Sequence, residues 1–298
     1  MIKNKCKLCN SYHLKDYGET LHQCHDIPGI TNRKRHIFRC LDCRSIFIDP
    51  IPNVNELSYY YDHYARANIG GNSWHRRNCL PIILQLAKNI KRGKVLDIGC
   101  GDGSFLDRLP ASLEKYGVEL SENAYLKAIS KGIKCYCASW DLAELEPKFD
   151  LVIALDFIEH VTDPYKAIKK MGRALKAGGF LVIETGNADS LAAKLLGKKW
   201  HYTYIFGHLV TLSPKALIAI SKDSKVEPVS LIKGYHSRLT SDLLFRTFLG
   251  IGLTLFRVLF LPLRSMIIKD KFLGRIYDPL SPGLPLPDHM IFLGKKKV

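Results

Sequence analysis

The amino-acid sequence predicts an α/β fold in which helices cover both faces of a mostly parallel sheet. Short apolar segments typical of buried strands alternate with helical segments of roughly 10–15 residues. A glycine-rich turn directly follows the first of these strands. Apolar residues make up 47% of the 298 residues and charged residues 24%, which excludes a disordered or collagen-like chain. The expected strands are 95–98, 116–119, 134–136, 149–154 and 180–184.

The first 50 residues contain two C-x-x-C pairs separated by thirty residues. Each pair turns two thiolates toward one point, and four thiolates complete the tetrahedral shell of Zn²⁺. The alternative is two unrelated reduced pairs, and His22, Cys24 or His25 in the intervening segment is a candidate substitute ligand. A closed four-thiolate site has no open position for water, so we expect a structural zinc ribbon. Its ligands would be Cys6, Cys9, Cys40 and Cys43.

The chain has nine cysteines and a net charge of +16. The cysteines concern the redox compartment of the protein, and the charge concerns its binding partners. No apolar run follows the first residues, so we expect reduced thiols in the cytoplasm rather than disulfides. Residues 93–233 carry 19 basic and 17 acidic residues and are nearly neutral. The excess of positive charge therefore lies in the flanking regions, which favours contact with an anionic partner there.

The region 51–92 is expected to be a helical linker or lid. Asp49 and Pro50 begin a segment with two prolines that closes the first module. The aromatic stretch 57–64 reads as helical, and apolar residues recur at i, i+3 and i+4 across 74–91.

The turn after the first strand is the main cofactor signal. Gly99, Gly101 and Gly103 allow a tight strand-to-helix turn and close backbone approach to a ligand. Glu119 ends the second strand, where an acidic side chain can accept both hydroxyls of a ribose. The turn alone would also fit a dinucleotide, although its GxGxG spacing differs from GxGxxG.

Segments 95–103, 117–121, 149–161 and 175–181 together resemble the motifs of class I S-adenosylmethionine-dependent methyltransferases, over residues 75–233. The resemblance implies a Rossmann-like sheet. It also implies that Asp97 and the glycines hold the methionine part of the cofactor, Glu119 the ribose and Asp141 the adenine. Ala138–Trp140 departs from the Gly-Asp of many relatives. The implied cofactor-binding residues are Asp97, Gly99, Cys100, Gly101, Gly103, Glu119, Leu120, Asp141, Leu142 and Leu155.

Asp156, Glu159 and His160 follow the strand 149–154 at i, i+3 and i+4, so on a helix they would face one another. They lie at the carboxyl edge of the sheet, where ligands bind in such folds. His160 is a candidate general base for O-methylation. The trio would alternatively hold a divalent cation, as in some quinone-precursor O-methyltransferases, or pack under the cofactor. His208 is a second candidate base, with capping or packing as its alternative role.

The expected domains are a zinc ribbon (1–50), the linker (51–92), the core (93–233), an insert (234–287) and the last strand (288–298). Strands 229–232 and 289–293 would form an antiparallel pair. In the insert, Arg246, Arg257 and Arg264 fall on one stripe of an apolar helix that is too short to span a bilayer. We expect residues 243–275 to bind an anionic membrane surface, with packing against the domain or a dimer partner as the alternative.

Segments 39–52, 56–60 and 200–213, joined to this core, resemble bacterial methyltransferases of surface-polysaccharide synthesis. That resemblance implies O-methylation of a sugar, nucleotide-sugar or lipid-linked glycan by a cytoplasmic enzyme peripheral to the inner membrane face. One alternative is a nucleic-acid methyltransferase whose basic flanks grip phosphates, although this leaves the apolar stretch 243–263 unexplained. Others are a quinone-precursor or small-molecule O-methyltransferase and a non-catalytic scaffold.

Overall fold

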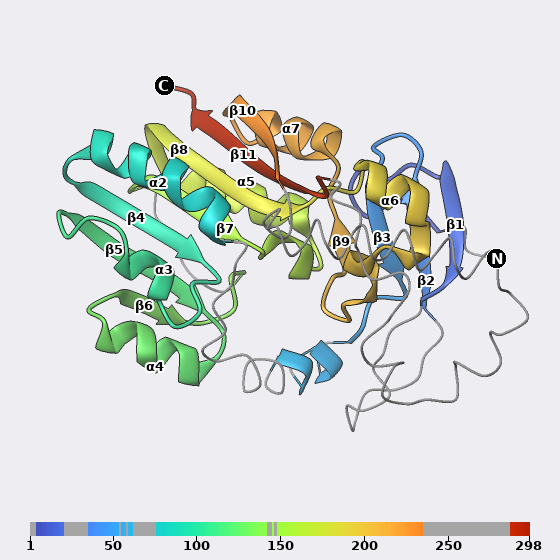
Figure 1. Ribbon diagram of the computed structural model, residues 1–298, viewed down its shortest axis with the longest axis horizontal. Helices are drawn as coiled ribbons and strands as arrows, with labels where there is room; N and C mark the ends of the chain where they lie inside the picture. The colour runs from blue at the N-terminus through green and yellow to red at the C-terminus, as the bar shows by residue number, and fades with distance from the viewer. Residues whose placement is uncertain are drawn as a thin grey trace, which may run out of the picture.

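The computed structural model describes residues 4–20, 35–53, 55–57, 59–61, 76–141, 145, 148–234 and 287–298. Within these residues the strands form a seven-stranded sheet, ordered β10-β11-β8-β7-β4-β5-β6, and a four-stranded sheet, ordered β1-β2-β3-β9. Figure 1 shows β1, β2 and β3 at the opposite end of the molecule from β5 and β6. The expected α/β fold with a mostly parallel sheet is confirmed.

The large sheet combines five parallel strands with an antiparallel pair at one edge. Its apolar strands are buried on both faces, as a parallel sheet between helices requires. Strand β11 inserts antiparallel between β8 and β10, as expected for the end of the core. The strands are β4 (Gly93–Ile98), β5 (Leu113–Glu119), β6 (Lys134–Cys137), β7 (Phe149–Leu155), β8 (Leu175–Gly186), β10 (Val226–Gly234) and β11 (His289–Lys296).

Successive strand residues point to opposite faces and enter two different apolar clusters. Val95 and Ile153 pack with side chains of α2 and α3, whereas Leu96 and Val152 pack with those of α5 and α7. Ser121, Asp163 and Ser213 cap the first turns of α4, α5 and α7 with their side-chain oxygens. The helices are α2 (Arg76–Ile90), α3 (Ser104–Asp107), α4 (Glu122–Ser130), α5 (Pro164–Ala174), α6 (Leu191–Leu196) and α7 (Pro214–Asp223). Residues 55–57 and 59–61 are also helical.

The small sheet joins the cysteine-bearing module to the core. It contains β1 (Leu14–Glu19), β2 (His36–Cys40), β3 (Ile46–Asp49) and β9 (Val210–Thr211). Ile46 of β3 pairs with Thr211 of β9, which belongs to the core segment of the chain. Val210 and Thr211 thus supply an edge strand on which the first module docks.

Four strands begin earlier than the apolar runs predict. Among them, β4 starts at Gly93 rather than at 95 and β5 at Leu113 rather than at 116. Strand β8 starts at Leu175 rather than at 180, because Leu175 pairs with Phe149 before a register shift in β7. Gly178 and Gly179 lie inside this irregular strand, with Gly178 at φ +77°. Strand β10 starts at Val226 rather than at 229.

Several sequence predictions lie outside the described residues. These are the apolar stretch 243–263, the three arginines Arg246, Arg257 and Arg264, the basic extension to 275, the alternative ligands His22, Cys24 and His25, and Leu142. Among the helices that the structure describes, none is both long and apolar enough to cross a membrane.

Candidate active site

The glycine-rich turn closes tightly over the end of β5. The backbone N–H groups of Gly99 and Cys100 both donate to the carbonyl of Val118, at 2.8 and 3.2 Å. Gly99, Gly101 and Gly103 all have positive φ, which side chains other than hydrogen strongly disfavour. The sequence therefore predicted the turn for a local reason: glycine adopts these backbone conformations without strain, and a Cβ at Gly99 or Gly103 would also lie 2.8 Å from Phe157 or 2.2 Å from Ile133.

Glu119 lies directly beside this turn. Its Oε2 accepts a hydrogen bond from the Gly101 backbone N–H at 2.9 Å, and its Oε1 accepts one from Ser121 at 2.8 Å. Each carboxylate oxygen has two lone pairs, so both oxygens can accept a further bond from a ligand hydroxyl. The Glu119 carboxylate and the glycine-rich turn therefore lie next to each other at the carboxyl ends of β4 and β5.

The other residues implied for the cofactor are distributed around this turn. Asp97 and Cys100 are buried beneath it, Leu155 is buried at the end of β7, and Leu120 is exposed. Asp141 accepts a hydrogen bond from the Ser139 hydroxyl, which holds the pKa of the Asp141 carboxyl below its usual range. Asp141 thus lies after β6 as an ionised carboxylate.

The acidic and histidine residues after β7 do not form the expected helical trio. Asp156 has a left-handed backbone with φ +48°, and only Ile158–His160 form a short 3₁₀ turn. Candidate ligand atoms of Glu159, His160 and His208 lie within 4.8 Å of one another, and Asp156 is not part of that group. The group of three therefore contains His208 where the sequence predicted Asp156. Asp156 lies outside the 3₁₀ turn because its backbone has a positive φ.

Glu159 is fully buried between hydroxyl donors. Its carboxylate accepts hydrogen bonds from Thr185 Oγ1 at 2.9 Å and from the hydroxyl of Tyr202. Burial, reinforced by the nearby carboxylate of Asp156, raises the pKa of Glu159 to about 7. Glu159 thereby ties the turn after β7 to the loop that follows α6.

His160 is held in one tautomer by the backbone. Its Nδ1 lies 3.0 Å from the carbonyl oxygen of Gly207, which can only accept, so Nδ1 carries the proton. The lone pair is then on Nε2. Burial lowers the pKa of His160 to about 4, so the ring is neutral at physiological pH and can accept a proton.

His208 follows the same logic. Its Nδ1 lies 2.9 Å from the carbonyl oxygen of Tyr202, and burial lowers the pKa of His208 well below its usual range. The rings of His160 and His208 meet edge to face with centroids 4.8 Å apart. The structure thus brings both candidate bases, 48 positions apart in sequence, into direct contact.

A second group of buried polar side chains, which the sequence did not predict, lies at the carboxyl edge of the sheet around His289. His289, at the start of β11, has its Nδ1 3.0 Å from Asp288 Oδ1 and its Nε2 4.0 Å from Asp156 Oδ1. Burial opposes the charge of His289, but the hydrogen bond to Asp288 and the surrounding carboxylates raise its pKa overall. Burial raises the pKa of Glu184 on β8 to about 8. No local motif connects these positions, so only the pairing of β11 with β8 could reveal them.

The four predicted zinc ligands converge in the first module. Sulfur atoms of Cys6 and Cys43 lie 3.5 Å apart, as do those of Cys9 and Cys40, and all four lie within 4.8 Å of one another. In a tetrahedral site with Zn–S of about 2.3 Å, the sulfur atoms are roughly 3.8 Å apart. The spacing of the thiols therefore fits one Zn²⁺.

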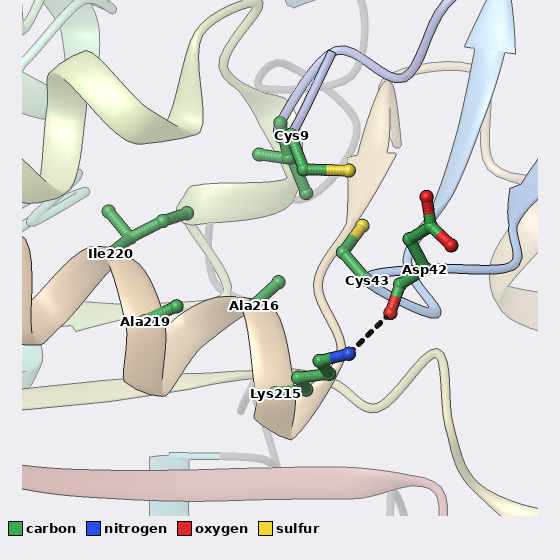
Figure 2. A pocket seen from close by; sticks show the side chains of 8 residues that line it. Cys9, Asp42, Cys43, Lys215, Ala216, Ala219 and Ile220 are labelled. Atoms are coloured by element: carbon green, nitrogen blue, oxygen red, sulfur yellow. Dashed lines mark hydrogen bonds between the residues drawn. The ribbon is translucent and has the colours of Figure 1, made fainter. Parts of the chain in front are cut away.

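A cavity of about 210 Å³ lies beside this module, between the cysteine loops and α7 (Figure 2). Ala216, Ala219 and Ile220 of α7 form its apolar wall, and Lys215 donates to the carbonyl oxygen of Asp42 at 2.8 Å. This cavity is separate from the glycine-rich turn and from the histidine pair.

Comparisons with known proteins identify the family of the chain. A family model described as a methyltransferase domain matches residues 71–230. Among curated proteins, the chain is 25% identical to the ubiquinone biosynthesis O-methyltransferase of Bordetella avium over 50% of this chain and 68% of that protein. It is 37% identical to the protein of the same name from Idiomarina loihiensis over 37% of this chain and 50% of that protein. The chain thus spans between half and about two thirds of the length of these relatives.

Solved structures show the same fold. The [4+2]-cyclase SpnF superposes with a TM-score of 0.55 at 15% identity, covering 83% of this chain and 97% of that chain. The YcgJ protein of Bacillus subtilis superposes with a TM-score of 0.50 at 15% identity, covering 74% and 99%. At such identities the likeness concerns the fold alone. Because the family model covers more than half of the chain, the chain belongs to the methyltransferase domain family, whose fold is that of class I S-adenosylmethionine-dependent methyltransferases.

Proposed function

We propose that this protein transfers a methyl group from S-adenosylmethionine to a hydroxyl of a small, acidic acceptor of the quinone-precursor type, with His160 as general base. The observation that carries the proposal is the neutral His160 imidazole, whose Nδ1 is held by Gly207 at the carboxyl edge of the sheet. The curated relatives are named ubiquinone biosynthesis O-methyltransferases, which supports this class of acceptor.

The residues around the glycine-rich turn fit the cofactor. The turn leaves room for close backbone approach, and Glu119 can accept the ribose hydroxyls while it holds Gly101. S-adenosylmethionine supplies a methyl group that is already electrophilic. The chain therefore has to orient the acceptor oxygen and remove its proton.

The acidity of the acceptor hydroxyl discriminates between acceptor classes. Transfer of a proton to a histidine with a pKa of about 4 is uphill by roughly 6 units from a phenol. From an alcohol as weakly acidic as water the gap is roughly 12 units. Each unit costs about 1.4 kcal/mol, and the difference of roughly 6 units between the two hydroxyls is the same for any base, so removal of the proton favours a phenolic acceptor. This argument and the named relatives favour the small-molecule alternative over the glycan reading, which stays a prediction.

We propose further that Cys6, Cys9, Cys40 and Cys43 bind one structural Zn²⁺. The support is the convergence of the four sulfur atoms at the spacing of a tetrahedral thiolate site. Metal binding would stabilise a module whose own apolar core is small.

An acceptor screen tests the proposed reaction. Purified protein and labelled S-adenosylmethionine are incubated with catechol-type phenols, nucleotide-sugars, membrane lipids and RNA, and the transferred methyl is counted. Transfer to the phenols is expected. Transfer to nucleotide-sugars or to RNA, with none to phenols, would refute the acceptor class, and failure to bind S-adenosylmethionine in calorimetry would refute the enzyme class.

A further inference from the structure

We propose that Cys100 and Cys135 form a modification site at which a hydroperoxide generates a disulfide, and that this disulfide weakens cofactor binding. Cys100 lies inside the glycine-rich turn and Cys135 lies on β6, with their sulfur atoms 3.6 Å apart. The effect on the cofactor rests on the proposed role of that turn, whereas formation of the disulfide does not.

The two cysteines come from elements separated by β5, and Gly117 allows them to meet. In the sheet, Gly117 pairs with Asp97 of β4 on one side and with Cys135 of β6 on the other. A Cβ at Gly117 would lie 2.5 Å from the sulfur of Cys100 and 3.3 Å from that of Cys135. The space above β5 is therefore filled by two thiols only because β5 has no side chain there.

The environment gives the two sulfur atoms different roles. Cys100 is fully buried, whereas Cys135 is partly exposed and within reach of a small solute. The hydrogen bond from Cys100 lowers the pKa of the Cys135 thiol despite its partial burial. The same hydrogen bond and burial raise the pKa of Cys100. Since the thiolate is the nucleophile, Cys135 is the attacking sulfur and Cys100 the resolving one.

The reaction balances with the hydroperoxide as the two-electron oxidant. The Cys135 thiolate attacks one peroxide oxygen, the O–O bond breaks, and the products are Cys135 sulfenic acid and an alkoxide, which takes a proton from water. The sulfur of Cys100 then attacks the sulfenic sulfur. The S–O bond breaks, the disulfide forms, and the hydroxide leaves as water with the Cys100 proton.

Disulfide formation changes the shape of the turn. A disulfide is about 2.05 Å long, so the two sulfur atoms must approach each other by roughly 1.5 Å. Cys100 stands between Gly99 and Gly101, and the N–H groups of Gly99 and Cys100 anchor the turn to Val118. Movement of Cys100 toward β6 therefore also displaces the N–H of Gly101, which donates to Glu119. This movement would weaken two proposed contacts with the cofactor, that of the turn backbone with the methionine part and that of Glu119 with the ribose.

Peptide mapping and calorimetry test the two parts of the proposal separately. The full-length protein is treated with hydrogen peroxide, its remaining thiols are alkylated, and a non-reducing tryptic digest is analysed by mass spectrometry. A cross-link between peptides 95–108 and 135–148 is expected in wild type and in Cys137→Ser, and not in Cys135→Ser. Affinity for S-adenosylmethionine is expected to fall at least tenfold on oxidation and to recover with dithiothreitol, whereas Cys135→Ser keeps its affinity.

Two outcomes overturn the proposal. One is the absence of the cross-link while reduced protein binds S-adenosylmethionine, which leaves the proposed function intact. The other is an oxidised protein that carries the cross-link but binds the cofactor as tightly as the reduced protein. If the reduced protein itself fails to bind S-adenosylmethionine, the proposed function is refuted, and so is the effect of the disulfide on cofactor binding. In that case the cross-link still tests whether Cys100 and Cys135 form a disulfide.

Discussion

The carboxylate of Glu119 accepts a hydrogen bond from the backbone N–H of Gly101 at 2.9 Å, so the end of β5 and the glycine-rich turn form one unit. This contact positions the carboxylate where the ribose of a nucleoside would approach the turn. It also means that a change at Glu119 acts on the turn as well as on the ligand.

Replacement of Glu119 by Gln is expected to weaken binding of S-adenosylmethionine by at least tenfold, or about 1.4 kcal/mol. The amide keeps the size of the side chain but loses the charge and one acceptor. Isothermal titration calorimetry measures the effect. Glu122→Gln, an exposed neighbour at the start of α4, should bind like wild type, and equal affinities for all three proteins would contradict the role of Glu119.

The change His160→Gln should lower kcat by roughly 10²-fold or more, because general base catalysis is typically worth that much. Affinity for S-adenosylmethionine should stay within about twofold, since His160 contacts Gly207 rather than the glycine-rich turn. The matched control is His13→Gln, whose side chain is 76% exposed. A variant that retains wild-type kcat with the phenolic acceptor would assign His160 a packing role.

Glu184 should make stability depend on pH with a defined sign. Its pKa is raised to about 8 in the folded protein, so the folded state keeps a proton that the unfolded state releases near pH 4.5. Stability from this group is therefore present below about pH 4.5 and is lost as pH rises toward 8.

The change Glu184→Gln, which mimics the protonated carboxyl, should consequently raise the free energy of unfolding by about 2–4 kcal/mol at pH 8 and by little at pH 4.5. Urea denaturation at the two pH values measures it. Glu227→Gln on β10, whose side chain is 42% exposed and pairs with Lys297, should show no gain at pH 8. A gain that is equal at both pH values would show that the carboxyl does not titrate in this window.

Asp189 links the cysteine-bearing module to the core. It pairs with Arg39 at 2.9 Å and with Arg44 at 3.3 Å, and Arg39 also donates to the Ala188 carbonyl at 2.7 Å. Since Arg39 is only 8% exposed, Asp189→Asn leaves a buried cation without its counter-charge and should destabilise the protein by about 2 kcal/mol. Thermal denaturation and limited proteolysis of residues 1–50 report the loss, and Asp107→Asn at an exposed position is the control. Unchanged protease resistance would show that Asp189 does not hold the cysteine-bearing module against the core.

Zinc content tests the cysteine module. Purified protein should contain about one equivalent of zinc by mass spectrometry, and Cys6→Ser should contain none and melt at a lower temperature. Cys137→Ser, an exposed cysteine outside the module, should keep both the metal and the melting temperature. A metal-free wild-type protein with an unchanged melt after chelation would refute the site.

Much of the fold could be predicted because its signals are local. Apolar runs such as 149–154 must be buried on both faces, and β7 and its neighbours appear where those runs lie. The strand ends were less predictable, since the start of β8 at Leu175 depends on a pairing with Phe149 and not on its own glycine-rich sequence. The expected helical trio after β7 failed for a similar reason. Spacing implies a common face only if the backbone is helical, and Asp156 adopts φ +48° instead.

The sequence by itself determined the glycine-rich turn and its contact with Glu119. Gly99, Gly101 and Glu119 lie in one βαβ unit, where backbone sterics and strand order leave little freedom in how they meet. Only the tertiary structure decided the rest. His160 meets His208, Cys100 meets Cys135, and β3 of the cysteine module pairs with β9 of the core through contacts between distant parts of the chain. Such contacts depend on packing and strand order across the whole molecule, and no spacing along the sequence encodes them.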